Sequence, residues 1–348
     1  MKLMFVYWGY ENAGSMLDLR GYTRAARAMG HEVLVYGPPN PAFALDYSKY
    51  LDGADAVVFV FEWTTALQFG DRLDWTRLVE AVPRNRRLII DCDGAYNDPI
   101  EFRGDYNHRS VQESRYWTDV CDSLADKIFQ PTYRPERSNV RPFLFHIYDP
   151  TWETPIELAG KEFDMVYVGH TKFRWGGMHK VLSAIEHVRD RVGRIALIGE
   201  GWGEPPDWMK AEEGKHYVDR EYLKRVGVEV MPAVPVGQVT ECINKGVFNP
   251  VVYRPLFERL EMVTCRTFET PAAGTIPLLL LDRDYVAEIF GERALELRLD
   301  DTTSHEKILD VLERPEHYAE IVMGIREDFG RRHTPEARLR ELISFIEE

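Results

Sequence analysis

Short apolar runs alternate with helix-like segments along most of this chain. In the first half the apolar runs are Leu3–Trp8, Glu32–Tyr36, Ala56–Phe61, Leu88–Asp91 and Lys127–Gln130. Apolar residues at helical spacing fill intervals between them at Met16–Met29, Trp75–Ala81 and Arg109–Leu124. Continuous apolar strands separated by helices are typical of a parallel sheet covered on both faces. The pattern therefore predicts an α/β fold.

The alternation starts again after a proline-containing stretch, which we interpret as an interdomain linker at about residues 146–162. The predicted elements beyond it are strands at Asp164–Gly169, Arg194–Gly199 and Val228–Met231, helices at Met178–Val192 and Val236–Lys245, and a helix–strand unit at Arg266–Leu281. A chain of 348 residues exceeds the size at which a single core keeps growing. We predict domains at 1–155 and 156–330, followed by a helical tail at 331–348.

The composition argues against several kinds of partner and site. A formal net charge of −14 disfavours nucleic acid and anionic lipid as bulk partners. The four cysteines lie far apart without a Cys-x-x-Cys pair, which fits a reducing cytosol and gives no zinc site. No apolar run is long enough for a secretory core or a membrane span, so we expect a cytoplasmic protein.

Two carboxylates, Glu261 and Glu269, stand eight positions apart just before an apolar strand. A short predicted helix ends at Gly274, directly before this strand. Doubly wound α/β domains bind ligands outside the ends of their strands. Carboxylate oxygens accept hydrogen bonds from hydroxyls, so this junction suits a hydroxyl-rich ligand. The alternative is an ordinary helix-to-strand turn with two solvated acids.

Two further strand ends in the second half carry candidate donor-site residues. Gly169 ends one strand, and His170, Lys172 and Arg174 follow in the loop before a helix. Cations there would neutralise a departing diphosphate, and the arginine fork engages two phosphate oxygens at once. After the next strand, Gly201 permits a tight turn beneath a nucleotide and Trp202 offers a ring to stack on a base. The alternatives are solvated basic residues and an aromatic side chain that fills a gap.

Strand ends in the first half supply candidate acceptor residues. The loop after the first strand contains Tyr10, Glu11 and Asn12 as polar candidates. Asp91-Cys92-Asp93-Gly94 closes a later strand, and Asp93 is a candidate acceptor-binding residue or catalytic base. Mg²⁺ or Mn²⁺ held by Asp91 and Asp93 is the alternative, since two neighbouring carboxylates suit a hard cation. His108 is the nearest imidazole and a second candidate base.

Four segments together resemble the nucleotide-sugar-binding half of a GT-B glycosyltransferase, similar to the spore-maturation-protein-like glycosyltransferases. They are Tyr167–Arg174, Ile198–Gly203, Asn244–Pro250 and Arg266–Leu281. The resemblance implies two Rossmann-like domains whose parallel sheets face a central cleft, with the C-terminal helix crossing back to the N-terminal domain. It also implies that Glu269 bonds the ribose hydroxyls, that Arg174 contacts the diphosphate, that Arg266 organises the same loop, and that Gly169 lies near the donor phosphates.

Glu261 and Glu269 also match the Glu-x₇-Glu spacing of many retaining members of that class, in which the first glutamate faces the donor sugar. The segment between the acids, Met-Val-Thr-Cys-Arg-Thr-Phe, departs from the Gly/Phe-rich segment usual there. The spacing slightly favours a retaining mechanism with Glu261 at the donor sugar. An inverting reaction would need a base, for which Asp93 and His108 are the candidates.

We therefore expect a metal-independent glycosyltransferase that uses a nucleoside-diphosphate sugar as co-substrate and a carbohydrate or small-molecule acceptor. The alternatives are a nucleotide-sugar epimerase or hydrolase of the same fold, and a non-catalytic nucleotide-sugar-binding protein. No residue pattern selects the nucleobase, the sugar, the acceptor or the oligomeric state.

Overall fold

The computed structural model describes residues 1–7, 14–37, 39–48, 53–62, 80, 82–100, 111–210, 213–300 and 302–348. The chain divides into two compact units. The first unit comprises Met1–Tyr148, Arg259–Cys265 and Arg331–Glu348, and the second comprises Asp149–Glu258 and Arg266–Gly330. The predicted helix at 75–81 lies outside the described residues, apart from Glu80.

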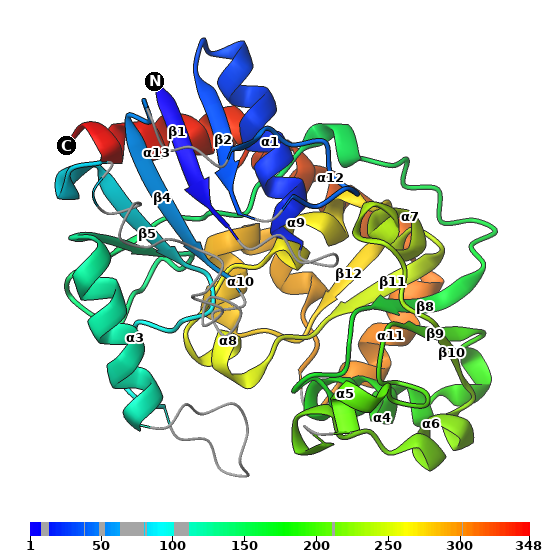
Figure 1. Ribbon diagram of the computed structural model, residues 1–348. Helices are drawn as coiled ribbons and strands as arrows, with labels where there is room; N and C mark the ends of the chain where they lie inside the picture. Colours follow the sequence, from blue (N-terminus) through cyan, green and yellow to red (C-terminus); the bar gives the residue numbers. More distant parts are fainter. Residues whose placement is uncertain are drawn as a thin grey trace. The chain divides into compact units, whose positions relative to one another are not determined.

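The first unit contains a seven-stranded parallel sheet (Figure 1). Its strands are β1 (Lys2–Val6), β2 (Glu32–Tyr36), β3 (Tyr47–Ser48), β4 (Ala56–Phe61), β5 (Arg87–Asp91), β6 (Lys127–Gln130) and β7 (Val140–Pro142). Their order across the sheet is β3-β2-β1-β4-β5-β6-β7. Because β1 lies inside the sheet and the chain proceeds outward from it in both directions, the sheet is doubly wound.

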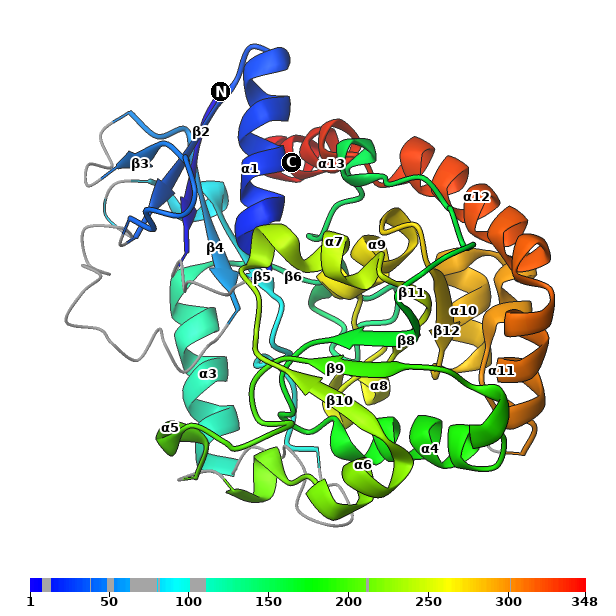
Figure 2. The ribbon, with the colours of Figure 1, turned by 90° about the vertical axis from the view of Figure 1, so that its right-hand side faces the viewer.

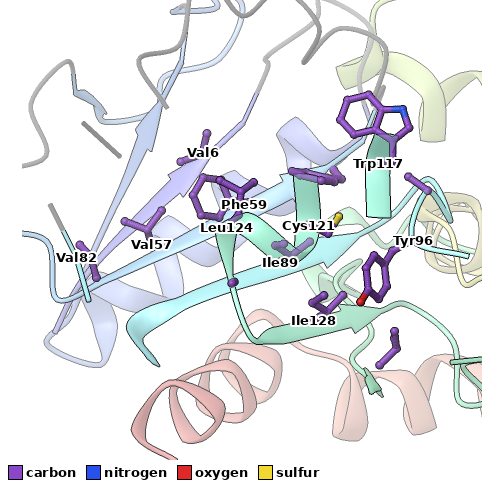
Figure 3. Close-up of a cluster of buried hydrophobic side chains, with 14 of the residues drawn as sticks. Val6, Val57, Phe59, Val82, Ile89, Tyr96, Trp117, Cys121, Leu124 and Ile128 are labelled. Atoms are coloured by element: carbon purple, nitrogen blue, oxygen red, sulfur yellow. The ribbon is translucent and has the colours of Figure 1, made fainter. Parts of the chain in front are cut away.

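Successive side chains of these strands point to opposite faces, and helices cover both. One face packs against helix α3 (Val111–Leu124) in the cluster shown in Figure 3, which includes Val6, Val57, Phe59, Ile89, Trp117, Cys121 and Leu124. On the other face, the Phe5 ring lies 5.7 Å from Tyr22 of α1 (Ser15–Ala28). The Phe129 ring stacks 4.7 Å from Phe345 of α13 (Pro335–Glu347). Helices α1 and α13 thus lie side by side on this second face (Figures 1 and 2).

The second unit contains a five-stranded parallel sheet in the order β10-β9-β8-β11-β12. The strands are β8 (Phe163–Val168), β9 (Ile195–Ile198), β10 (Val228–Met231), β11 (Gly246–Val251) and β12 (Ile276–Leu279). The helices from this part of the chain are α4 (Trp175–Glu186), α5 (Asp207–Lys210), α6 (Arg220–Val226), α7 (Val239–Ile243), α8 (Pro255–Arg259), α9 (Cys265–Ala272), α10 (Arg283–Phe290), α11 (Ser304–Glu313) and α12 (Pro315–Arg332).

The predicted α/β fold with parallel sheets is confirmed. The predicted tail is helical from Pro335, where the Thr334 side chain caps α13 by accepting from the Ala337 N–H. The sequence did not indicate β3, β7 or β11 as strands. The start of the predicted linker is well ordered: His146 and Ile147 are buried, and the Asp18 carboxylate accepts from the Ile147 N–H at 3.0 Å. Among the described residues, no helix has the length and apolar character needed to cross a bilayer.

Candidate active site

The loop after β8 is packed tightly against the end of β9. The Gly169 N–H donates to the Ile198 carbonyl at 2.8 Å. A Cβ at Gly199 would lie 2.3 Å from the Gly169 carbonyl oxygen, and Gly199 has a φ of +148°. Only glycine allows this approach without displacing one of the loops. The two strand ends thus form a rigid base for the side chains that follow Gly169.

Those side chains are positioned by a strained turn. Phe173 has a φ of +56°, in the left-handed region that non-glycine residues seldom adopt. Its ring is buried, and its N–H donates to the Lys215 carbonyl at 2.7 Å. The turn places Arg174 immediately before α4 and turns its guanidinium back toward His170. Strain of this kind concentrates at functional sites, where the surrounding structure holds it in place.

A cluster of basic side chains surrounds His170. The Arg174 Nη1 lies 3.2 Å from the His170 Nδ1 and donates to the His170 carbonyl at 3.3 Å. The imidazole of His216 lies 6.4 Å from that of His170, measured between ring centroids. Burial lowers the pKa of His170 well below its usual range, and the charges of Arg174 and Arg254, followed by His216 and Lys172, lower it further. His170 is therefore neutral at physiological pH, and the charges of Lys172 and Arg174 from one loop and of Arg254 from another act on it.

This arrangement suits an anion. Arg254 follows β11, whereas Lys172 and Arg174 precede α4, a helix of 12 residues. The first N–H groups of a helix have no partner within the helix, and its dipole favours negative charge at that end. A Cβ at Gly177 would lie 2.4 Å from Cγ1 of Val252, so the start of α4 packs closely on the segment that leads to Arg254. A diphosphate would meet guanidinium groups from both loops here.

The loop after β9 supports this site from within the protein. Trp202 is fully buried, and its indole N–H donates to the Gly169 carbonyl at 2.6 Å. A Cβ at Gly201 would lie 2.3 Å from Oγ1 of Thr171, so this glycine allows the two loops to pack. Burial corrects the predicted role of Trp202, which offers no exposed face to a base, whereas Gly201 has a φ of +90° that suits the predicted tight turn.

Helix α9 carries the second predicted acid. Glu269 is 3% exposed, and its Oε2 lies 3.2 Å from the Arg266 Nη1. The helix runs away from the carboxyl edge of the sheet, since the Thr154 N–H, from the segment before β8, donates to the Ala272 carbonyl at 2.9 Å. Arg326 of α12 also donates to the Ala272 carbonyl, at 3.1 Å. Arg266 thus stands at the same edge as the loop after β8, with Glu269 one helical turn behind it.

Glu261 has a different environment. It belongs to the first unit and has a φ of +50°. The Arg134 Nη1 donates to both of its carboxylate oxygens, at 2.9 and 3.2 Å. The Val263 N–H donates to the Pro131 carbonyl at 2.6 Å and holds the segment beside the loop that carries Arg134. The two glutamates of the Glu-x₇-Glu pattern therefore have separate arginine partners, Arg134 for Glu261 and Arg266 for Glu269.

The carboxyl edge of the first sheet contains the predicted Asp91–Asp93 pair. The Asp91 carboxylate is buried and accepts from the N–H groups of Ala95 and Tyr96, both at 2.8 Å, and from the Gln130 amide at 2.9 Å. Asp91 therefore stabilises the turn, and its oxygens are occupied. Asp93 is partly exposed. Within the described ranges, no group of three or more His, Cys, Asp or Glu side chains is arranged to hold a metal ion.

Four predicted residues lie outside the described ranges: Tyr10, Glu11, Asn12 and His108. The sequence analysis also missed two residues of interest. Arg254 follows β11, a strand whose Asn and Pro residues obscured its apolar pattern. Glu62 follows the fully buried β4, and a polar residue directly after such a strand is the signal that would have identified it.

Comparisons with known proteins agree with this architecture. The sequence pattern of the family described as "glycosyl transferase-like" matches residues 179–344. No curated protein sequence matches the chain. Among solved structures, an alpha-glucosyltransferase in complex with UDP and a DNA 13-mer is similar, with a TM-score of 0.66 and 13% identity over 100% of this chain and 99% of that one.

Two further structures have the same fold. A glycosyltransferase from Rickettsia africae has a TM-score of 0.59 and 10% identity, over 99% of this chain and 97% of its own. The T4 phage enzyme BGT, in complex with UDP and Mn²⁺, has a TM-score of 0.56 and 12% identity over the whole of both chains. With the glycosyl transferase-like pattern over residues 179–344 and the GT-B fold over its whole length, the chain is a glycosyltransferase.

Proposed function

We propose that this enzyme transfers a sugar from a UDP-sugar to a neutral, hydroxyl-bearing acceptor without an obligatory metal ion. The observation that carries the proposal is the basic cluster of Lys172, Arg174 and Arg254 around a neutral His170 at the start of α4. Nucleoside diphosphates carry their charge on the diphosphate, which such a cluster would bind. UDP is bound in the similar glucosyltransferase structures, which supports a uridine donor.

In this proposal each residue of the second unit has a distinct role. Arg174 and Arg254 bind the diphosphate and stabilise the charge that develops on it as the glycosidic bond breaks. Gly169 brings the loop close to the phosphates, and His170 donates or accepts a hydrogen bond as a neutral ring. Glu269 accepts hydrogen bonds from the ribose hydroxyls, and Arg266 orients its carboxylate through the 3.2 Å ion pair.

Fixed cations make a metal ion dispensable for the departure of UDP. Guanidinium groups supply positive charge at the leaving diphosphate. A divalent ion neutralises the same charge in other transferases. One similar structure contains Mn²⁺ with UDP, so the dependence has to be measured on this enzyme. The proposal predicts equal turnover in EDTA and in Mn²⁺.

The acceptor we propose is uncharged. One similar structure is named as a complex with DNA and another as a DNA-modifying enzyme. DNA is a polyanion. The net charge of −14 on this chain opposes the approach of a phosphate backbone. The first sheet presents Glu62 and Asp93 at its carboxyl edge, and carboxylates accept hydrogen bonds from neutral hydroxyls.

The test is UDP release from a panel of UDP-sugars, with and without p-nitrophenyl glycosides as hydroxyl acceptors. We expect release that rises with an acceptor and falls about 100-fold in Arg254→Ala, because a cation at the developing charge is lost. Arg225→Ala, an exposed arginine of the same unit, is the matched control. Release independent of any acceptor would indicate a hydrolase instead. UDP binding without turnover of any UDP-sugar would indicate a non-catalytic protein.

A further inference from the structure

Glu62 lies in a polar cluster at the carboxyl edge of the first sheet. It directly follows β4, and Tyr7 directly follows the neighbouring strand β1. The Tyr7 hydroxyl donates to the Glu62 Oε2 at 2.6 Å. Tyr7 is fully buried, whereas Glu62 is partly exposed. The cluster thus orients one carboxylate from within the protein and leaves part of it accessible.

A buried histidine–aspartate pair lies close to this carboxylate. The His146 Nδ1 is 2.7 Å from the Asp18 Oδ2, and the other Asp18 oxygen accepts from the Ile147 N–H at 3.0 Å. His146 and Asp18 are 4% and 1% exposed. The charge on His146 acts on Glu62, and Asp18 fixes the ring that carries it. The pair therefore gives Glu62 a neighbouring imidazole whose orientation is fixed.

Ser15 and Asp93 complete the surroundings of Glu62. The Ser15 hydroxyl, at the start of α1, is fully buried and lies close enough to Glu62 to lower the pKa of its carboxyl. Burial raises the pKa of Glu62, and Asp93 raises it further, whereas His146, Ser15 and Tyr7 lower it. Cys92, which is buried nearby, remains a neutral thiol because burial raises its pKa well above the usual value.

Glu62 and Asp91 have different hydrogen-bond partners. Asp91, at the end of the next strand, accepts hydrogen bonds from two backbone N–H groups and one amide, which is how a structural acid is satisfied. Glu62 has no such set of backbone donors among the described contacts: the Tyr7 hydroxyl donates to it at 2.6 Å, and the Ser15 hydroxyl lies near it. A carboxylate that retains acceptor capacity and is partly exposed can still bind an incoming hydroxyl.

We propose that Glu62 is the general base of the transfer reaction, with Tyr7 and the His146–Asp18 pair as its positioning residues. The Glu62 carboxylate removes the proton of the acceptor hydroxyl while that oxygen forms a bond to the anomeric carbon of the donor. The bond from the anomeric carbon to the diphosphate breaks, and its electron pair leaves with UDP. Glu62 then carries the proton and releases it to water, and the configuration at the anomeric carbon is inverted.

This inference rests on the proposed function, because it needs a UDP-sugar as the donor. It replaces the slight preference for retention that the Glu-x₇-Glu spacing suggested. In the structure, Arg134 occupies the carboxylate of Glu261, the residue on which that preference depended. The base also differs from the candidates of the sequence analysis: Asp93 is a neighbour of Glu62, and His108 lies outside the described residues.

The experiment measures UDP-glucose turnover, with water as the acceptor, in the wild type and in Glu62→Gln. Glu32→Gln, an exposed acid of β2, is the matched control. We expect Glu62→Gln to lower kcat about 100-fold or more, as the loss of a general base does, and Glu32→Gln to leave kcat unchanged. The first glucose formed, followed by NMR, is expected to be the β-anomer, since UDP-glucose is an α-glycoside.

A second variant separates catalysis from folding. Tyr7→Phe removes a hydrogen bond that stabilises the ionised form of Glu62. The acidic limb of the kcat/KM profile should therefore move to higher pH in this variant. Turnover by Glu62→Gln within about 3-fold of the wild type, α-glucose as first product, or an unmoved acidic limb would each overturn the assignment. Calorimetric UDP titrations of the same variants report on the donor site alone. Absence of UDP binding in the wild type would contradict the proposed function, independently of the role of Glu62.

Discussion

The carboxyl edges of the two parallel sheets carry opposite charge. At the edge of the first sheet stand the acids Glu62, Asp91 and Asp93. The loops at the corresponding edge of the second sheet carry Lys172, Arg174 and Arg254 around His170. Both edges arise from the same doubly wound architecture, so the fold supplies the positions and the residues after each strand determine the chemistry. One edge suits an anion, and the other suits a hydroxyl from which a proton is removed.

The largest expected effect is a loss of UDP affinity when a cation at the edge of the second sheet is removed. Arg174→Ala should weaken UDP binding about 100-fold, because a charge-assisted and bidentate contact to the diphosphate is lost. Arg225→Ala serves as the control, since Arg225 is exposed and pairs with Glu186 on the surface. Isothermal calorimetry gives both dissociation constants. Equal UDP affinity in Arg174→Ala and the wild type would remove Arg174 from the donor site.

The next effect concerns the hydrogen bond between the buried Trp202 and the loop that carries Arg174. Trp202→Phe removes the indole N–H that donates to the Gly169 carbonyl and should lower the free energy of unfolding by about 1–3 kcal/mol. The ratio of UDP to GDP affinity should stay unchanged, because the buried ring contacts no base. Urea denaturation and calorimetry measure the two quantities. A changed ratio of UDP to GDP affinity, with an unchanged free energy of unfolding, would mean that Trp202 stacks on the base after all.

The third effect depends on pH and concerns two histidines, His170 at the cationic edge and His333 elsewhere. Folding lowers the pKa of His170 well below its usual value and that of buried His333 to about 2. The folded state therefore binds fewer protons than the unfolded state below about pH 6.5, so stability falls as the pH is lowered through that range. For His333 the loss between pH 7 and pH 5 is about 2 kcal/mol.

Denaturation at both pH values in His333→Gln and His170→Gln checks this. Each substitution should reduce the difference in unfolding free energy between pH 7 and pH 5. An unchanged difference in His170→Gln would mean that the neighbouring cations do not hold that imidazole neutral.

The smallest effect concerns the ribose. If the Glu269 carboxylate binds the ribose hydroxyls, the wild type should bind UDP about 10-fold more tightly than 2′-deoxy-UDP, since a hydrogen bond to a charged group is worth about 1.5–3 kcal/mol. In Glu269→Gln this difference should shrink to about 3-fold or less. Competition calorimetry gives the ratio. A ratio that is the same in both proteins would place the ribose elsewhere.

The sequence predicted most of the fold because its central strands are continuous apolar runs. Strands β2, β4, β6 and β10 have the predicted bounds. Strand β11 escaped prediction because Asn249 and Pro250 interrupt its apolar pattern. Asn249 is nevertheless buried, where its side-chain amide donates to the Val166 carbonyl of the neighbouring strand at 2.6 Å. Tertiary contacts thus allow a polar residue that local pattern alone excludes.

The candidate site was predictable where charge follows a glycine at a strand end, as at Gly169–Arg174. The roles of Trp202 and Asp91 were not, because burial and hydrogen-bond partners decide them and neither has a sequence signature. Trp202 donates inward to the Gly169 carbonyl, and Asp91 accepts three hydrogen bonds within its own unit. Arg254 and Glu62 belong to no sequence motif. Arg254 is identified by its effect on the pKa of His170, and Glu62 by its hydrogen bond from Tyr7.

The central claim is that the cations of the second unit bind the diphosphate of the donor. The most direct test compares UDP with uridine by calorimetry in the wild type and in Arg254→Ala. We predict that the wild type binds UDP at least about 100-fold more tightly than uridine, and that Arg254→Ala loses most of this difference while its affinity for uridine is unchanged. An identical UDP-to-uridine ratio in the two proteins would contradict the account.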